Sequence, residues 1–321
     1  MPSFEIRPFQ RADRDQLADL VNAHASAVVP GMGTSVASLL ASLERDPAEA
    51  ITDPWVTQRV TLVAEQQRRV VAAAHLLRYG DQAPTGESYF GLGQVEWLVF
   101  WPEAPAGNPH WADATAAAET LMASCIARLE EWRAARQCAE GDLPVPCGVY
   151  GVPEQWPHVR KLYERAGFSH TGHSEVVYLA RVVDLPRLGA AAGHGLEVRR
   201  SIGMRGTRLS ALEGEVSVGY IEVEIRGRAE RLSGYGRWAD IGNFYVAKEY
   251  RRRGIGSWLL GQAAEWLERA GAEHLLDYTY ADERNPDGID PGAYQAFLAS
   301  RGFRELTRTC RGWTRALPGR S

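Results

Sequence analysis

The order of strand-like and helix-like segments occurs twice along the chain, and this repetition constrains the fold more than any other feature of the sequence. The two halves open with similar short runs, FEIRPF at residues 4–9 and LEVRR at residues 196–200. In each half, early strands lead to a strongly apolar strand, a long amphipathic helix, a further strand, a short helix and closing strands. A repeat of this length indicates duplicated domains. A chain of 321 residues has room for two cores.

Apolar spacing, capping residues and turn residues predict the elements of each half, which together give a mixed α/β (α+β) class. The first half is expected to contain helices at 12–24, 36–43, 112–135 and 160–166 and strands at 4–9, 60–65, 70–77, 95–101, 147–150 and 176–179. The second half has no room for two early helices. It is expected to contain strands at 196–200, 207–213, 216–225, 238–246, 274–280 and 303–314 and helices at 257–270 and 291–300.

A stretch without apolar periodicity separates the two halves. Residues 181–195, RVVDLPRLGAAAGHG, are rich in Gly and Ala, as interdomain linkers are. We therefore expect a first domain at residues 1–182, a linker at 183–195 and a second domain at 196–321.

Composition argues against several classes of function. The net charge of −4 lacks the basic excess of a nucleic-acid-binding domain. The opening residues, MPSFEIRPFQRADRDQ, contain no apolar leader, and no apolar run approaches the roughly 20 residues that cross a bilayer. The four cysteines lack C-x-x-C spacing, which favours reduced thiols and no structural metal. We expect a cytoplasmic protein with neither a nucleic-acid nor a membrane partner.

One stretch of the second half concentrates positive charge beside glycine, YRRRGIGSWLL at residues 250–260. It lies between an expected strand and an expected helix. The first turn of a helix presents N–H groups without internal partners and the positive end of the helix dipole. Gly254 and Gly256 leave these amides accessible, and the arginines add charge-assisted hydrogen bonds. The stretch therefore suits a pyrophosphate, although a solvated basic loop is the alternative. Neither a Walker sequence nor a dinucleotide GxGxxG is present at this place.

This stretch resembles the acetyl-CoA signature of the GNAT superfamily of N-acetyltransferases, Arg/Gln-x-x-Gly-x-Gly/Ala, which is matched by Arg251, Gly254 and Gly256. The resemblance implies two GNAT-like domains, each a mixed, mostly antiparallel twisted sheet flanked by helices, in a layout similar to two-domain members such as mycothiol synthase. It also implies that strand 238–246 splays from strand 274–280 to receive the pantetheine arm. The implied cosubstrate is acetyl-CoA, held by Tyr245, Val246, Arg251, Arg252, Arg253, Gly254, Ile255, Gly256 and Ser257.

The family also implies a tyrosine, late in the last helix, that protonates the departing thiolate. Tyr163 matches this landmark in the first half, but Leu298 stands in its place in the second half. Tyr294 lies one helical turn earlier on the same face and is our candidate general acid. The alternative is that Tyr294 only packs and that solvent protonates the thiolate.

The amine must lose a proton during the transfer, so a carboxylate near the strand is expected to help. Asp240 is the first candidate, with a capping or solvent-facing role as the alternative. Glu222 on the preceding strand is the second, with a solvated strand face as the alternative. On the following strand, Asp277 and Tyr278 point to opposite faces, so at most one of them reaches the substrate.

The first half lacks the glycine signature. Its strand 95–101 is followed by PEAPAGNPH, so we expect this domain to keep the fold without productive CoA binding. The resemblance implies an acetyl-CoA-dependent N-acetyltransferase that acts on a primary amine of a small molecule, as a monomer or a homodimer. The alternative is an acyl-CoA sensor without turnover.

Overall fold

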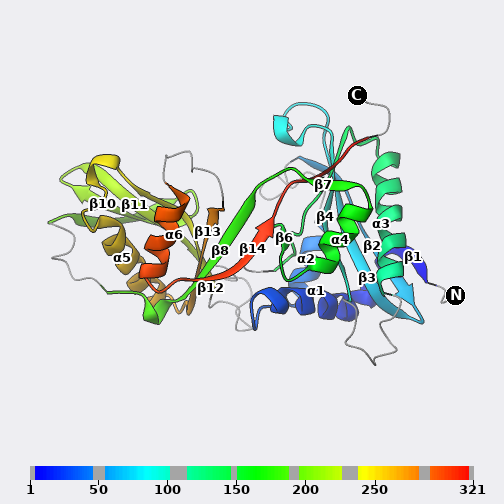
Figure 1. The fold of residues 1–321 in the computed structure, drawn as a ribbon, viewed down its shortest axis with the longest axis horizontal. Helices are drawn as coiled ribbons and strands as arrows, with labels where there is room; N and C mark the ends of the chain where they lie inside the picture. Colours follow the sequence, from blue (N-terminus) through cyan, green and yellow to red (C-terminus); the bar gives the residue numbers. More distant parts are fainter. Residues whose placement is uncertain are drawn as a thin grey trace. The chain divides into compact units, whose positions relative to one another are not determined.

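The computed structural model of the chain describes residues 4–45, 55–101, 114–145, 150–187, 195–225, 238–281 and 290–317. The chain forms two compact units. Unit 1 contains residues 1–174 and 308–321, and unit 2 contains residues 175–307. Each unit has its own sheet and helices (Figure 1). The mixed α/β class with two mostly antiparallel sheets is confirmed. The expected strand at 147–150 and the loop after residue 101 lie almost entirely outside the described residues.

Unit 1 is built on a seven-stranded sheet of order β1-β2-β3-β4-β5-β15-β7. The chain crosses from β4 to β5 through a helix, and these two strands are parallel, as a crossover connection requires. The strands are β1 (Glu5–Pro8), β2 (Val56–Gln66), β3 (Arg69–Tyr79), β4 (Leu92–Phe100), β5 (Arg136–Ala139), β7 (Phe168–His170) and β15 (Trp313–Arg315), with the short β6 (Val152–Pro153) outside this sheet. The helices are α1 (Arg14–Val28), α2 (Val36–Leu43), α3 (Ala114–Glu131) and α4 (Pro157–Arg165).

Local sequence explains most of these elements. Helix α1 continues to Val28, four residues beyond the expected end, because Ala25 and Val28 extend its buried face. Ser35 caps α2 by accepting a hydrogen bond from the Ser38 amide. The turn between β2 and β3 uses no Asn-Gly pair. Instead, Gln67 and Arg68 adopt positive φ angles of 49° and 65°, the backbone that a tight hairpin needs.

The second sheet has the order β6-β14-β8-β13-β12-β11-β10-β9, in which the short β6 of unit 1 pairs with the end of β14 and the strands from β8 to β9 carry unit 2. Strands β9 and β10 form a hairpin, and the two early helices of unit 1 have no counterpart between them, as the sequence predicts. The strands are β8 (Ser174–Arg181), β9 (Glu197–Gly203), β10 (Gly206–Glu213), β11 (Val216–Ile225), β12 (Trp238–Val246), β13 (His274–Tyr280) and β14 (Arg304–Cys310). The helices are α5 (Ile255–Arg269) and α6 (Pro291–Ser300).

The core of unit 2 lies on one face of this sheet. Helix α5 buries Leu259, Leu260 and Ala263 there, each at 0% exposure. They pack with apolar side chains from β8 to β13 and with Leu298 of α6. Burial of this size is the main source of stability in such a unit.

The closing strand of each half lies in the sheet of the other unit, not in the domain to which the sequence-based boundaries assign it. We expected strand 176–179 in the first domain, but β8 pairs antiparallel with β13 of unit 2. We expected the last strands in the second domain, but β15 lies between β5 and β7 of unit 1. The chain therefore passes from one unit to the other twice, within β8 and within β14.

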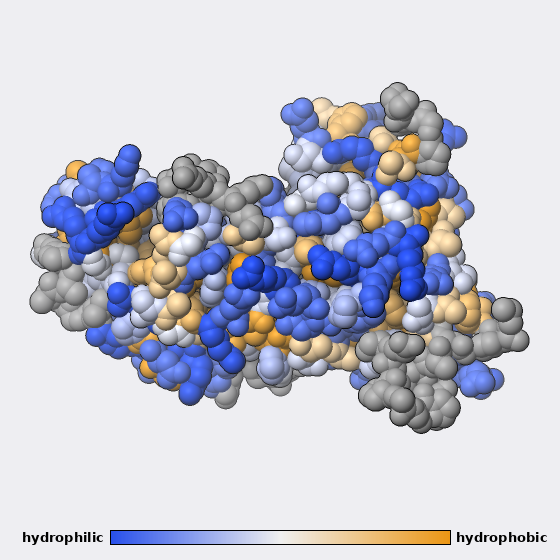
Figure 2. Space-filling model, viewed as in Figure 1, coloured by the Kyte–Doolittle hydropathy of each residue, from blue (hydrophilic) through white to orange (hydrophobic). Residues whose placement is uncertain are grey.

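The face of the molecule seen in Figure 2 carries polar residues interspersed with apolar ones. Among the described helices, none combines the length and apolar character needed to traverse a lipid bilayer.

Candidate active site

A gap between two parallel strands marks the candidate site in unit 2. Strands β12 and β13 are paired only through Trp238↔His274, Ala239↔Leu275 and Asp240↔Leu276. Beyond Asp240, β12 continues for six residues beside β11 without a pair on β13. The splay that the sequence resemblance implied is therefore confirmed in this ladder. Where two parallel strands diverge, the main-chain N–H and C=O groups on their facing edges lose their partners and become available to a ligand.

A β-bulge lies where the gap begins. The register between β11 and β12 shifts between Glu222 and Val223, which leaves Gly242 as the extra residue. A Cβ on Gly242 would lie 2.2 Å from the Cβ of Arg205, so only glycine fits under the β9–β10 turn. Bulges of this kind change the direction of the strand beside a site.

The peptide groups at the end of β12 alternate between β11 and the gap. The Ala247 amide donates to the Val218 carbonyl of β11 at 2.9 Å, so the Val246 carbonyl of the same trans peptide faces the gap. The Tyr245 carbonyl lies against Gly219 of β11, so the Val246 amide also faces the gap. Of the two expected main-chain contacts, Val246 is placed for a ligand in the gap and Tyr245 is turned toward β11.

The arginine–glycine loop joins β12 to α5 by way of a short 3-10 turn, η6 (Lys248–Tyr250). Gly254 is the N-cap of α5, is exposed and has a φ of 83°. Arg252 is also exposed and adopts a φ of 62°, a conformation that is rare outside glycine and is enriched at functional sites. Alternating backbone of this kind turns successive N–H groups toward one point and favours an anion.

The residues expected to hold the coenzyme differ in exposure. Arg252, Arg253 and Gly254 are exposed, and the Arg253 guanidinium lies 5.1 Å from the centre of the Tyr250 ring. The Arg251 Nε donates to the Val246 carbonyl at 2.9 Å, which ties the loop to the end of β12. Ile255 and Ser257 are buried in the first turn of α5, so only their amides are placed to take part.

Aromatic side chains connect the helix start to the gap. A Cβ on Gly256 would lie 3.6–3.8 Å from Phe244, Phe297 and Val246, so these three side chains surround the first turn of α5. The Tyr294 ring packs against Phe244 with centroids 6.5 Å apart and stacks on Phe297 at 6.1 Å. All four side chains are half-buried, so part of each remains accessible.

Asp277 lies at the point where the strands separate, one residue beyond the last paired residue of β13. Only 4% of it is exposed. Its Oδ2 accepts from the Tyr294 hydroxyl at 2.5 Å, and its Oδ1 accepts from the Tyr278 amide at 2.8 Å. Burial raises the pKa of Asp277 to about 7; the two hydrogen bonds oppose the rise, and the nearby charge of Asp240 adds to it. Burial, followed by the neighbouring Asp277 carboxylate, also raises the pKa of Tyr294 well above its ordinary value.

Asp240 and Glu222 lie on the opposite face of the sheet from Asp277. Asp240 is directly opposite Glu224 on β11, is 5% exposed and forms the last pair of the β12–β13 ladder with Leu276. Its neighbours Ala239 and Ile241 belong to the α5 core, so its side chain faces the other way. Asp240 therefore lies at the edge of the gap, and its catalytic role stays a prediction.

Glu222 is fully buried and receives four hydrogen bonds. The donors are the amides of Met204 and Arg205 at 3.2 Å, Arg208 Nε at 2.6 Å and Asn243 Nδ2 at 2.5 Å. Burial opposes ionisation, but the bonds from Asn243, Arg208 and Arg205 outweigh it and lower the pKa. A carboxylate held in this way is a poor proton acceptor. It holds the β9–β10 turn against the bulge.

In the corresponding region of unit 1, the side chains of β4 are buried. The β4–β5 ladder ends at Val95↔Ala139, and beyond it Trp97, Val99 and Phe100 are each no more than 1% exposed. Tyr163, which matches the family landmark, is fully buried and donates to the Glu140 carbonyl at 2.6 Å. Its hydroxyl is therefore engaged in holding the fold.

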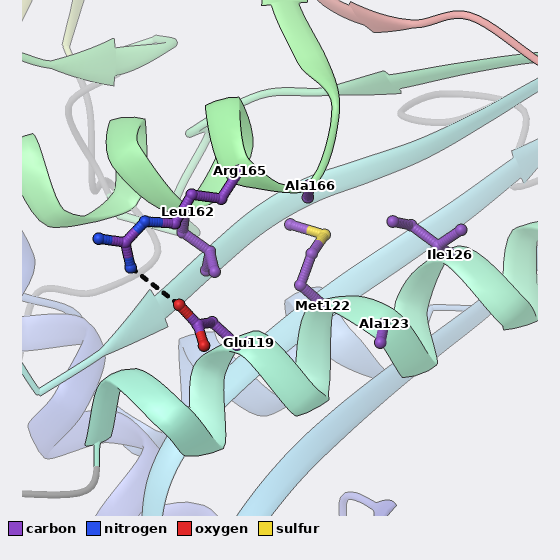
Figure 3. A pocket seen from close by; sticks show the side chains of 7 residues that line it. All are labelled: Glu119, Met122, Ala123, Ile126, Leu162, Arg165 and Ala166. Atoms are coloured by element: carbon purple, nitrogen blue, oxygen red, sulfur yellow. Dashed lines mark hydrogen bonds and ion pairs between the residues drawn. The ribbon is translucent and has the colours of Figure 1, made fainter.

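A cavity of about 250 Å³ lies between α3 and α4 of unit 1 (Figure 3). An ion pair from Arg165 to Glu119 at 2.8 Å lies at one end of it, and the other lining side chains are apolar. They are Met122, Ala123, Ile126, Leu162 and Ala166. Among the described residues, no three His, Cys, Asp or Glu side chains gather as a metal site would require.

Sequence reasoning missed the pairing of Asp277 with Tyr294. Each residue was noticed separately, but the contact joins β13 to α6 across 17 positions. One signal was present. An acidic residue in an otherwise apolar strand, HLLDYTY, needs a buried partner.

Comparison with known proteins gives a similarity over part of the chain. Residues 194–290 match the model of the Acetyltransferase (GNAT) family. No curated protein is similar enough in sequence to this chain to count as a match.

Several solved structures share the fold. One is a tandem GNAT protein from the clavulanic acid biosynthesis pathway, with a TM-score of 0.63, 16% identity and coverage of 99% of this chain and 100% of that one. A GCN5-related N-acetyltransferase from Sphaerobacter thermophilus has a TM-score of 0.57 and 15% identity, and the match covers 97% and 94% of the two chains. A GCN5-related glucosamine N-acetyltransferase region of a fungal multi-domain protein has a TM-score of 0.59 and 12% identity; the match covers 98% of this chain but 38% of that one.

Proposed function

We propose that unit 2 transfers an acetyl group from acetyl-CoA to a primary amine of a small molecule. The match of residues 194–290 to the GNAT acetyltransferase model and the tandem GNAT fold of the whole chain support this proposal. The gap that opens after Asp240 beside the start of α5 is the observation that carries this proposal. Unit 1 keeps the fold, but the residues of its β4 beyond the β4–β5 ladder are buried and its sequence lacks the glycine signature, so we assign it no coenzyme site.

The residues of unit 2 fit the coenzyme in three ways. The amides around Gly254, with Arg252 and Arg253 at the rim, suit a pyrophosphate. The gap beyond Asp240 suits a thin pantetheine arm. The Val246 amide faces the gap and is placed to donate to a thioester carbonyl, where charge develops during attack.

The reaction needs a neutral amine that attacks the thioester directly. Asp240, at the edge of the gap on the face opposite Asp277, is our candidate for the group that accepts the proton of the amine. Glu222 is less suited because four donors already hold its carboxylate. We propose a small-molecule amine as the acceptor and neither nucleic acid nor membrane as a partner.

A sensor that binds acyl-CoA without turnover is the second candidate. Leu298, fully buried, stands where the family has its tyrosine, and this residue favours the sensor. Coenzyme release separates the two functions. Amine-dependent release of CoA from acetyl-CoA supports the transferase, whereas tight CoA binding without release across aminoglycosides, polyamines, amino acids and peptides supports the sensor.

A charge reversal in the loop tests the coenzyme site itself. Arg252→Glu combined with Gly254→Asp places two carboxylates at the start of α5, where they repel phosphate and strain the left-handed N-cap. We expect the affinity for CoA, measured by calorimetry, to fall at least about 100-fold. Arg304→Glu, an exposed reversal on β14, is the matched control and is expected to bind CoA as the native protein does. Unchanged affinity in the loop variant would contradict both the transferase and the sensor.

A further inference from the structure

Asp277 and Tyr294 form a unit that the family landmark does not describe. The carboxyl lies on β13, and the hydroxyl that bonds to it lies on α6. They meet one residue beyond the last β12–β13 pair, where the gap opens. Their position brings a proton-bearing pair to the inner end of the region in which the coenzyme arm is expected.

The pair lies on the coenzyme side of the sheet. Asp277 shares a strand face with Leu275, which packs in the α5 core. Tyr294 packs against Phe244, and Phe244 in turn lies beside Gly256 in the first turn of α5. Phe244 and the Tyr294 ring therefore form a continuous aromatic surface from the loop proposed for the pyrophosphate to the Tyr294 hydroxyl. Asp240 lies on the other face, so two carboxylates flank the gap from opposite sides.

We propose that Asp277 supplies the proton that the departing coenzyme sulfur needs and that Tyr294 carries it. This inference rests on the proposed acyl transfer. Leu298 replaces the tyrosine that the family uses as proton donor. Tyr294 can act as the donor in its place because Asp277 returns a proton to its hydroxyl oxygen.

The proton steps balance as follows. The amine nitrogen forms a bond to the acyl carbon, the carbon–sulfur bond breaks and its electron pair stays on sulfur. Sulfur takes the Tyr294 hydroxyl proton, and the Tyr294 oxygen takes the carboxyl proton of Asp277 along their 2.5 Å hydrogen bond. Asp277 is left as a carboxylate and regains a proton from water. The amine nitrogen gives its proton to Asp240, which passes it on to water.

Tyr294 alone is a weak donor. Burial and the Asp277 carboxylate raise its pKa well above the ordinary value, which lies above that of a free thiol. Asp277 has a pKa raised to about 7 by burial, so a large fraction of it is protonated near neutral pH and is a stronger acid than a thiol. Once Asp277 carries a proton, it can donate to Tyr294, which frees the phenolic hydrogen for the sulfur.

Tyr294→Phe and Asp277→Asn test the relay in the full chain. With acetyl-CoA and the best amine from the panel, we expect each to lower kcat at least about 100-fold with little change in the KM for acetyl-CoA. We expect the double variant to be no slower than the slower single variant, because the two residues act as one unit. Asp290→Asn is the matched control, since Asn serves equally well as the N-cap of α6.

The pH profile gives a readout that a structural role would not move. Native kcat is expected to fall as the pH rises above about 7, where Asp277 loses its proton. Asp277→Asn is expected to lose this alkaline limb. An alkaline fall in kcat that persists in Asp277→Asn would overturn the relay, and so would single variants with native kcat. Either result would leave the proposed acetyl transfer unaffected.

A second readout needs no acceptor. The thiol of bound CoA can be titrated through the absorption of its thiolate, and Tyr294 as a donor is expected to lower the pKa of that thiol relative to the Tyr294→Phe protein. Equal thiol titrations with CoA bound overturn the relay alone. Absent CoA binding overturns the proposed function itself. Bound CoA without turnover of any amine contradicts both the transfer and the relay.

Discussion

At the scale of single residues, two buried carboxylates of unit 2 have opposite roles because their surroundings differ. Glu222 receives four donors, including a guanidinium, which favour its ionised form. Asp277 receives two neutral donors and lies near a second acid, so burial dominates. Both are acidic residues in strands, and the sequence offers no means of separating them.

Glu222→Gln tests the structural assignment. The substitution removes the charge that two amides, Arg208 and Asn243 share, so we expect unit 2 to lose roughly 2–3 kcal/mol in urea unfolding at pH 7. The folded pKa of Glu222 lies below its unfolded value, so its contribution is present above pH 4.5 and is lost as the pH falls through the folded pKa. Glu215→Gln, which changes a carboxylate that is 91% exposed, is the control. A variant as stable as the native chain would show that Glu222 does not hold the turn.

At the scale of elements, the strands and helices follow closely from local pattern. Helices 36–43 and 291–300 and strands 238–246 and 274–280 lie within the bounds that the sequence predicts. Their caps and apolar periods are local, so neighbouring residues suffice to define them. The contacts between elements are less accessible to such reasoning. An example is the pair formed by His24 on α1 and His158 on α4, whose Nε2 atoms lie 3.0 Å apart.

This histidine pair predicts acid sensitivity of unit 1. Burial lowers the pKa of each ring to about 4, so both are neutral in the folded unit and gain protons more readily when it unfolds. Stability should therefore be fully present above about pH 6.5 and fall as the pH drops from 6.5 toward 4. Thermal unfolding of unit 1 across this range is the measurement. His158→Gln keeps a donor for His24 and removes one titrating group, so it should flatten the decline. An equally steep decline in the variant would exclude the pair as its cause.

At the scale of the whole molecule, each unit completes its sheet with a strand from outside the expected domain boundary. Strand β8 lies beside β13 in unit 2, and β15 lies between β5 and β7 in unit 1. Trp313 of β15 is 1% exposed and packs edge-on against Tyr163, so unit 1 needs the end of the chain for its core. Domain boundaries drawn at 182 and 196 would divide both sheets.

Fragments with the two sets of boundaries test this arrangement. Residues 175–307 contain β8 to β13 with both helices, and we expect this fragment to fold cooperatively in circular dichroism melting. Residues 196–321 follow the sequence-based boundary and lack β8, so the apolar β13 edge with Leu275 and Leu276 loses its cover. We expect this fragment to aggregate or to melt at a lower temperature. Equal stability of the two fragments would contradict the assignment of β8 to unit 2 and of β15 to unit 1.

The sequence by itself determined the repeated element order, the α/β class and the loop at residues 250–256, because these depend on periodicity, capping and glycine placed within a few residues of one another. The tertiary structure decided which sheet receives β8 and β15, turned Tyr245 toward β11 and Val246 toward the gap, and joined Asp277 to Tyr294. Apolar periodicity shows that a strand is buried but not which strand lies beside it. A carboxylate's protonation likewise depends on neighbours that only the folded chain brings together.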